Sequence, residues 1–233
     1  MDNKELCSTC DYTNSCDEEQ KAQAEGTLCM KQYKLNYLYN EALIPEKQRK
    51  RIKLVTDADK SDTEVFKQLN EIANNADLFA DEGDNLYIFS AKTGNGKTSW
   101  AIRIVQSYFD KIWPTATLEC KALFINVPRF LLALKDNINT GNDEYVRQIK
   151  DNVIKADIVV WDDVGSKAAT IFEAESLFSI IDLRLNMGRA NIFTSNLNRD
   201  ELCEKLGDRL ASRIYGSSII AEIRGKDKRG LYK

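Results

Sequence analysis

The sequence predicts an α/β protein in which a parallel sheet is covered by helices on both faces, with a small cysteine-containing module at its N-terminus. Short apolar runs alternate with amphipathic stretches along most of the chain, and this alternation is typical of a parallel sheet. A glycine-rich loop joins one apolar run directly to a helix. The crowding of cysteines near the start of the chain sets the N-terminal module apart from the sheet domain.

The chain has 233 residues, of which 43% are hydrophobic and 30% are charged, as in ordinary globular proteins. A net charge of −3 does not indicate a strongly basic nucleic-acid protein, so any DNA contact must come from a local patch. The absence of histidine excludes histidine bases and histidine metal ligands. The polar N-terminus lacks the apolar core of a signal peptide, and we expect a cytoplasmic protein without a membrane span.

Composition divides the chain into three parts. Residues 1–43 carry the cysteine cluster and are predicted to form the N-terminal module. Residues 44–60 are predicted to be a linker, because Pro45 interrupts a helix and a charged stretch follows it. Residues 61–233 are predicted to form the α/β domain.

The elements of this domain follow from the spacing of apolar residues. From residue 61 to 79 they recur at helical spacing, and Ser61 or Asp62 can cap that helix. Short apolar runs predict buried strands at 86–89, 122–126, 158–161, 191–194 and 218–223. Between these strands we expect helices at 98–110, 129–136, 144–156, 171–185 and 200–214.

The loop after the first strand carries a phosphate-binding pattern. The usual P-loop reads G-x-x-x-x-G-K-[ST], and this chain matches its end, while Ala91 replaces the first glycine. The predicted nucleotide ligands in the loop are Gly94, Asn95, Gly96, Lys97, Thr98 and Ser99. Backbone amides at the helix start would wrap the phosphates of ATP, Lys97 would reach the β- and γ-phosphates, and the Thr98 hydroxyl would ligate Mg²⁺. A glycine-rich turn that contains a lysine by chance is the alternative.

Polar residues follow two other predicted strands. Asp162 and Asp163 end the apolar run 158–161. We expect Asp162 to bind and orient Mg²⁺, and Asp163 to accept a hydrogen bond from the attacking water. Asn196 follows the strand 191–194 and could contact the γ-phosphate. Ordinary turn or cap chemistry is the alternative for all three residues.

A short helical stretch near the C-terminus carries Arg209 and Arg213 on one face, because residues four apart are neighbours on a helix. An arginine finger given by a neighbouring subunit would neutralise charge on the transferred phosphate, and Arg213 is the candidate. A surface salt bridge, for example with Asp208, is the alternative.

Taken in order, these motifs resemble the DnaC/DnaI group of AAA+ helicase loaders, including phage-encoded members, with the IstB transposition helper as a close relative. The resemblance implies a P-loop AAA+ ATPase core without a C-terminal lid domain. It also implies that Asn196 is the sensor-1 residue, Arg213 the finger and Arg229 the terminal sensor-2 arginine. Asp163 stands where many AAA+ enzymes have Glu, so we expect slow, switch-like ATP hydrolysis.

The resemblance further implies an ATP-dependent loader that binds a hexameric replicative helicase of the DnaB type and helps place it on single-stranded DNA. It implies self-association through the ATPase domain, because the finger acts on a neighbour's nucleotide. A transposition helper that binds DNA and a transposase is the second interpretation. An adaptor whose ATPase part is a passive scaffold is the third.

The N-terminal cysteines are the candidate ligands of a structural metal. Cys7, Cys10, Cys16 and Cys29 supply four thiolates, which can close a tetrahedral zinc site. The segment has few large apolar residues, so zinc binding would supply its folding energy. An iron–sulfur cluster and free or disulfide-paired thiols are the alternatives. Some loaders of the group carry an N-terminal zinc domain that contacts the helicase.

Candidate contacts to single-stranded DNA are Arg129 and Lys135 on the predicted helix 129–136, together with the basic linker 47–53. Phe130 is the one aromatic residue there on which a base could stack. A solvated charged face is the alternative, so weak, ATP-dependent binding to single strands is a hypothesis.

Overall fold

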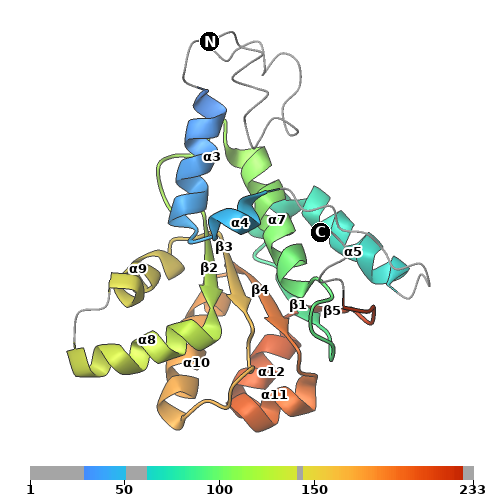
Figure 1. Ribbon diagram of the computed structural model, residues 1–233, viewed down its shortest axis with the longest axis vertical. Helices are drawn as coiled ribbons and strands as arrows, with labels where there is room; N and C mark the ends of the chain where they lie inside the picture. The colour runs from blue at the N-terminus through green and yellow to red at the C-terminus, as the bar shows by residue number, and fades with distance from the viewer. Residues whose placement is uncertain (1–28, 51–61, 141–143, 228–233) are drawn as a thin grey trace.

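The computed structural model describes residues 29–50, 62–140 and 144–227, in which a five-stranded sheet is covered by helices (Figure 1). The strands are β1 (Asn85–Phe89), β2 (Ala122–Asn126), β3 (Ile158–Asp162), β4 (Ala190–Ser195) and β5 (Ile219–Glu222). Their order is β2-β3-β4-β1-β5, and every neighbouring pair is parallel. The parallel α/β fold predicted from the alternation is therefore confirmed.

The helices differ from the predicted ones mainly in where they break. They are α3 (Met30–Glu41), α4 (Glu46–Arg49), α5 (Thr63–Asn74), α6 (Ala76–Asp81), α7 (Lys97–Ile112), α8 (Val127–Thr140), α9 (Glu144–Val153), α10 (Ile171–Asn186), α11 (Arg199–Leu206) and α12 (Asp208–Gly216). The helix predicted from 61 to 79 is interrupted at Asn75, whose backbone is not helical. The stretch 200–214 is interrupted at Gly207, whose φ of 86° suits only glycine well. None of the described helices is long and apolar enough to cross a membrane.

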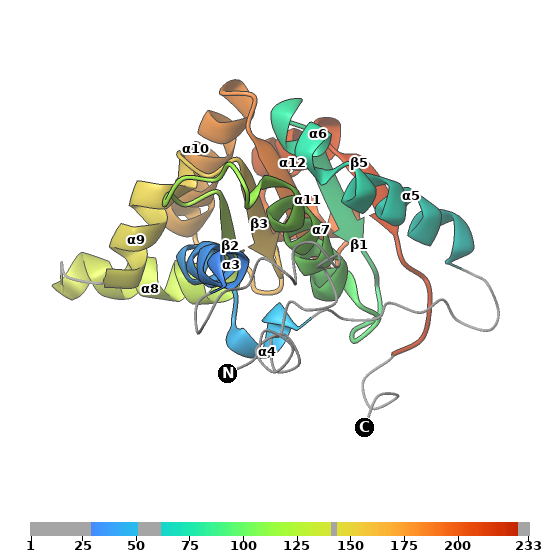
Figure 2. The same cartoon turned by 90° about the horizontal axis from the view of Figure 1, so that it is seen from above.

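Side chains of the strands enter two separate apolar layers, because successive residues of a strand point to opposite faces. Leu86 and Ile88 of β1 pack in the layer formed with α3, α5, α6 and α7. Tyr87, between them, packs in the layer formed with α8 to α12. Figure 2 shows these helices on the two sides of the sheet. Strands buried on both faces explain why the predicted runs are apolar throughout rather than alternating.

Helix α3 packs into the first layer, although the sequence assigned its residues to the N-terminal module. Leu35 is 1% exposed, and the ring of Tyr39 meets that of Phe109 on α7 edge-on, with 5.2 Å between the ring centroids. The carbonyl of Ala42 accepts a hydrogen bond from the backbone N–H of Phe124 on β2 at 2.8 Å. These contacts make α3 part of the core of the α/β domain. The exact boundary of an N-terminal module stays a prediction.

The first part of the predicted linker forms α4, which rests on α7. The side chain of Gln106 on α7 donates to the carbonyls of Gln48 and Arg49 at 3.2 and 3.0 Å. The Arg49 side chain donates back to the carbonyl of Ile44 at 2.9 Å. The chain that enters the domain is therefore fixed to α7. Residues 51–61 of the linker lie outside the described part of the chain.

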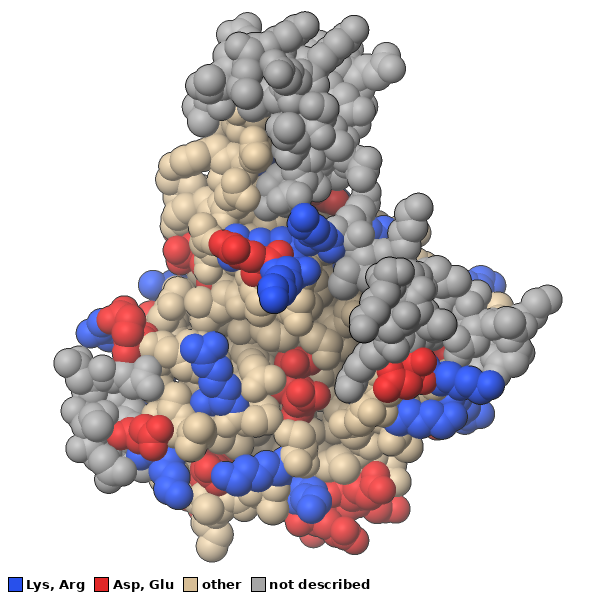
Figure 3. All heavy atoms as spheres, viewed as in Figure 1, with Lys and Arg blue, Asp and Glu red and all other residues tan. Residues whose placement is uncertain are grey.

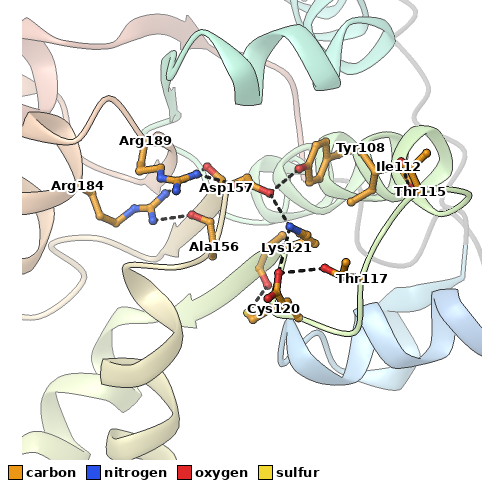
Figure 4. Close-up of polar contacts among 12 residues, drawn as sticks. Tyr108, Ile112, Thr115, Thr117, Cys120, Lys121, Ala156, Asp157, Arg184 and Arg189 are labelled. Carbon is orange, nitrogen blue, oxygen red and sulfur yellow. Dashed lines mark hydrogen bonds and ion pairs between the residues drawn. The ribbon is translucent and has the colours of Figure 1, made fainter.

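A buried arginine ties together the edge of the sheet at which β3 and β4 begin (Figure 4). Arg184 of α10 is 0% exposed. Its guanidinium donates to the carbonyls of Val153, Ala156, Asp157 and Ala190 and to the side chain of Asn191. The neighbouring Asp157 accepts from Arg189 at 2.7 Å and from the hydroxyl of Tyr108 on α7 at 2.8 Å. This network joins α9, α10, α7 and the starts of two central strands.

Substitution of Arg184 by Met should lower the free energy of unfolding by about 3–5 kcal/mol, because several buried acceptors lose their donor at once. Arg189→Met is the matched control, since that arginine is more than one-third exposed and its ion pair is worth at most about 1 kcal/mol. Urea unfolding followed by circular dichroism measures both changes. Equal midpoints for the two variants would contradict the assigned role of Arg184.

Candidate active site

The predicted P-loop lies between β1 and α7, and its glycines have backbone angles that other residues rarely adopt. The φ angles of Gly94 and Gly96 are +75° and +103°. A Cβ atom at residue 94 would also overlap the carboxylate of Asp227. Ala91 is exposed and has no positive φ. The missing first glycine therefore costs the loop no backbone strain.

The loop borders a cavity of about 240 Å³. Its lining consists of Thr93, Gly94, Asn95, Gly96, Lys97, Thr98, Ser99, Asp163 and Asn196. The structure thus gathers around one space every predicted ligand of the loop together with two residues that follow other strands. Parallel strands bring these residues together, because their carboxyl ends lie at the same edge of the sheet.

Lys97 is only 7% exposed, and its ammonium group joins the loop to the end of β4. Its Nζ atom donates to the Oδ1 atom of Asn196 at 2.6 Å and to the carbonyl of Lys92 at 3.0 Å. The lysine and the asparagine therefore lie within hydrogen-bonding distance of each other. A phosphate bound by one of them would also be within reach of the other.

Asp162 connects three elements at the carboxyl end of β3. Its Oδ1 atom accepts hydrogen bonds from the hydroxyls of Thr98 and Thr194, both at 2.8 Å. Burial is the main cause that raises the pKa of Asp162, and the nearby charge of Asp163 adds to it. Hydrogen bonds from the two threonines and from Asn126 oppose the rise in this pKa. The oxygens of Thr98 and Asp162 are the hard ligands that Mg²⁺ prefers, so the residues fit this ion.

Asp163, which lines the cavity, has a backbone conformation that is unusual for a residue other than glycine. Its φ is +59°, and Leu43 is the only other non-glycine residue in the described part of the chain with a positive φ. Its backbone N–H donates to the hydroxyl of Thr194 at 3.0 Å, which holds this conformation. Asp and Asn tolerate this region better than most residues. Strained residues of this kind cluster at active sites.

Arg213 does not line the cavity of its own chain. Its Nε atom forms an ion pair with Asp182 on α10 at 2.8 Å, and its side chain is 51% exposed. The surface salt bridge left open by the sequence is therefore present, with Asp182 rather than Asp208 as its partner. An exposed arginine on α12 is still accessible to a neighbouring subunit.

Part of the predicted site falls outside the described residues. Cys7, Cys10 and Cys16 lie there, and so does Arg229, the predicted sensor-2 residue. Cys29 directly precedes α3 as a free thiol. The described part of the chain contains no group of three or more residues able to hold a metal ion. Zinc at the four thiols stays a prediction.

The predicted DNA contacts are exposed on α8, but the aromatic candidate is not. Arg129 and Lys135 reach solvent, and the guanidinium of Arg129 lies 4.4 Å from the centroid of the Tyr145 ring. Phe130 is 0% exposed because it belongs to the apolar face of α8, so its predicted role as a stacking surface is wrong. Basic and acidic side chains are interspersed on the face shown in Figure 3. Among the described side chains visible there, no large area carries charge of one sign only.

Two polar residues of the site were not singled out from the sequence. Thr194 of β4 holds both Asp162 and Asp163, and Asn126 ends β2 opposite Asp162 in the strand register. Both stand at the carboxyl ends of strands that the sequence predicted. Their place at the carboxyl ends of strands could have pointed to these two residues. Their roles, however, depend on which strands are neighbours, and the sequence alone does not give the strand order.

Comparisons with known proteins found a matching family and curated relatives. The family model for IstB-like ATP binding proteins matches residues 18–225. The replicative helicase loader DnaC of Escherichia coli (strain K12) is 29% identical over 136 residues, which cover 57% of this chain and 51% of that protein. The chain thus spans about half the length of the curated relatives it matches.

Solved structures share the fold at low sequence identity. The crystal structure of the DnaC helicase loader has a TM-score of 0.57 at 21% identity, over 70% of this chain and 89% of that chain. The crystal structure of DnaI has a TM-score of 0.59 at 18% identity, over 77% of this chain and 94% of that chain. The resemblance seen in the motifs is confirmed by the family model, whose match includes the P-loop and both aspartates. The chain belongs to the family of IstB-like ATP binding proteins and is an ATP-binding ATPase of the AAA+ class.

Proposed function

We propose that this protein is an ATP-dependent loader that binds a hexameric replicative helicase and helps place it on single-stranded DNA. Sequence similarity to a replicative helicase loader supports the class of partner. One structural observation supports a switch that depends on assembly. The cavity carries a lysine, a carboxylate and two asparagines of one chain, yet no arginine of the described residues lines it. A cation from a second subunit would complete such a site.

The residues of the cavity fit hydrolysis of the terminal phosphate. Lys97 and the loop amides would bind the β- and γ-phosphates, and Thr98 and Asp162 would hold Mg²⁺, which would neutralise phosphate charge. Asp163 accepts a proton from water as the water oxygen bonds to the γ-phosphorus and the bond to the β–γ bridging oxygen breaks. Asn196 orients the γ-phosphate or the water. ADP and inorganic phosphate are the products.

Asp163→Asn tests the role of this carboxylate, because Asn keeps the shape and tolerates the positive φ. We expect the turnover number for ATP to fall by about 10²–10⁴-fold, as for loss of a general base. The affinity for nucleotide should change by less than about twofold, since only an interaction of the transition state is lost. Steady-state hydrolysis and titration with a fluorescent ATP analogue measure the two quantities. If the turnover number of Asp163→Asn were unchanged, a residue other than Asp163 would have to be the general base.

Arg213→Ala tests whether the site is shared between subunits. Loss of an arginine finger should lower turnover by about 10³-fold or more, whereas Arg209→Ala on the same helix should leave it near the original value. Mixing Arg213→Ala with Lys97→Ala protein should restore activity, because about a quarter of neighbouring pairs then combine an intact loop with an intact finger. Hydrolysis by Arg213→Ala at the rate of Arg209→Ala would exclude Arg213 as the finger.

Co-purification with the cognate replicative helicase tests the proposed function. We expect a stable complex whose amount changes when ATP is added, and Lys97→Ala should remove the effect of ATP. Lys111→Ala is the matched control, because that lysine lies at the far end of α7 and pairs with Asp77 on the surface. Absence of a complex both with and without ATP would overturn the loader proposal.

The same samples separate the two other interpretations. Binding to duplex DNA and to a transposase, without binding to a helicase, would favour the transposition helper of the IstB type. A helicase complex that Lys97→Ala leaves unchanged in formation and release would favour an adaptor with a passive ATPase part. The ATP-bound protein is expected to bind single-stranded DNA weakly. Titration with oligo-dT at low salt measures this binding.

A further inference from the structure

The C-terminal segment 223–227 lies beside the P-loop. It continues from β5, which pairs with β1, the strand that leads into the loop. The side chain of Asn95 donates to the carbonyl of Ile223 at 3.2 Å, and that of Lys92 donates to the carbonyl of Arg224 at 3.1 Å. These contacts bring together parts of the chain that are separated by about 130 positions.

The same segment is held from its other side by a buried carboxylate. Asp62 is 0% exposed, and its two oxygens accept hydrogen bonds from the backbone N–H groups of Arg224 and Gly225 at 2.7 and 2.9 Å. Asp62 directly precedes α5, where an Asp side chain normally caps its own helix. Here it makes no side-chain cap to α5. In Figures 1 and 2, α5 lies beside the edge of the sheet that β5 forms, as these hydrogen bonds require.

A chain of hydrogen bonds leads from this carboxylate to the phosphate-binding lysine. Asn95 is 1% exposed and donates both to the hydroxyl of Ser90 and to the carbonyl of Ile223. Its side-chain oxygen lies 3.5 Å from the Nζ atom of Lys97. The position of Asn95 therefore depends on the C-terminal segment, and it sets the surroundings of the lysine. The segment itself is fixed by Asp62.

We propose that Asp62 is a positioning residue for nucleotide binding. By fixing Arg224 and Gly225, it keeps the carbonyl of Ile223 in place for Asn95 and holds the P-loop in its phosphate-binding shape. Linkage makes this coupling reciprocal, so that bound nucleotide in turn stabilises the contact between Asp62 and the C-terminal segment. The proposal rests on ATP binding alone and is independent of any helicase.

Asp62→Ala tests the proposal against a purely structural role, with Glu64→Ala as the matched control. Glu64 is an exposed carboxylate in the first turn of the same helix, so its loss changes the local charge equally. For Asp62→Ala we expect the dissociation constant of a fluorescent ATP analogue to rise by about 5–20-fold, the scale of a typical coupling between sites. The KM for ATP should rise with it, while the turnover number stays within about twofold.

Asp62→Asn keeps one acceptor oxygen and should recover part of the lost affinity. Circular dichroism checks that each variant is folded at the assay temperature. An Asp62→Ala protein that is folded and binds nucleotide as tightly as Glu64→Ala would overturn the proposal. A fall in turnover with unchanged KM would overturn it as well, because a positioning role acts through binding.

Hydrogen exchange of the unaltered protein gives a second test that does not depend on how a variant folds. We expect the amides of Arg224 and Gly225 to exchange more slowly when an ATP analogue is bound, because the nucleotide opposes opening of the contact with Asp62. The Glu64→Ala protein should show the same slowing, and Asp62→Ala should lose it. Exchange at these amides that does not respond to nucleotide would overturn the proposal.

Discussion

The hydrogen bonds accepted by the Asp162 carboxylate are the constraint on which the site depends. This side chain ends β3, yet its partners are Thr98 at the start of α7 and Thr194 on β4. They can meet only if β3 and β4 are parallel and in the observed register, because a slip by one residue would turn Asp162 to the other face. At the opposite edge, Arg184 binds the starts of the same two strands and so fixes that register. The register that positions Asp162 in the candidate site is therefore fixed by hydrogen bonds at both ends of β3 and β4.

Much of the site could be predicted because its residues follow local rules. The P-loop has a fixed spacing, and Asp162, Asp163 and Asn196 each follow an apolar run that is long enough to be a buried strand. A polar residue at the carboxyl end of a parallel strand must lie at one edge of the sheet, whatever the strand order. No local pattern in the sequence indicates that the strands are arranged in the order β2-β3-β4-β1-β5. Without it, the pairing of Asn126 with Asp162 and the double role of Thr194 could not be foreseen.

Buried charges are where sequence reasoning fails most clearly. Arg184 and Asp62 occupy sequence positions typical of a solvated helix face and of a helix cap, yet both are 0% exposed. Burial of a charge is unfavourable unless hydrogen bonds replace water, and each of these groups binds backbone atoms far away in the sequence. Such partners are invisible to a local pattern. The same limit applies to α3, whose apolar residues belong to the sheet domain although cysteines precede them.

The two sides of the P-loop have different kinds of partner, and this difference bears on how nucleotide state can be sensed. On the cavity side, the loop contacts Asn196 and Asp162 through Lys97 and Thr98, and a bound phosphate and Mg²⁺ would compete for these same groups. Asn95 also lines the cavity, but its side-chain amide donates to Ser90 and to the carbonyl of Ile223 in the C-terminal segment. Under the proposed function, phosphate binding would therefore produce a local change at the ends of β3 and β4, where Asp162 and Asn196 stand. That edge lies next to α11 and α12, which follow β4 in the chain and carry the exposed Arg213. In the shared site proposed above, a change at this edge would reach the neighbouring subunit through Arg213, and the slow hydrolysis expected from the short Asp163 side chain would let the change persist.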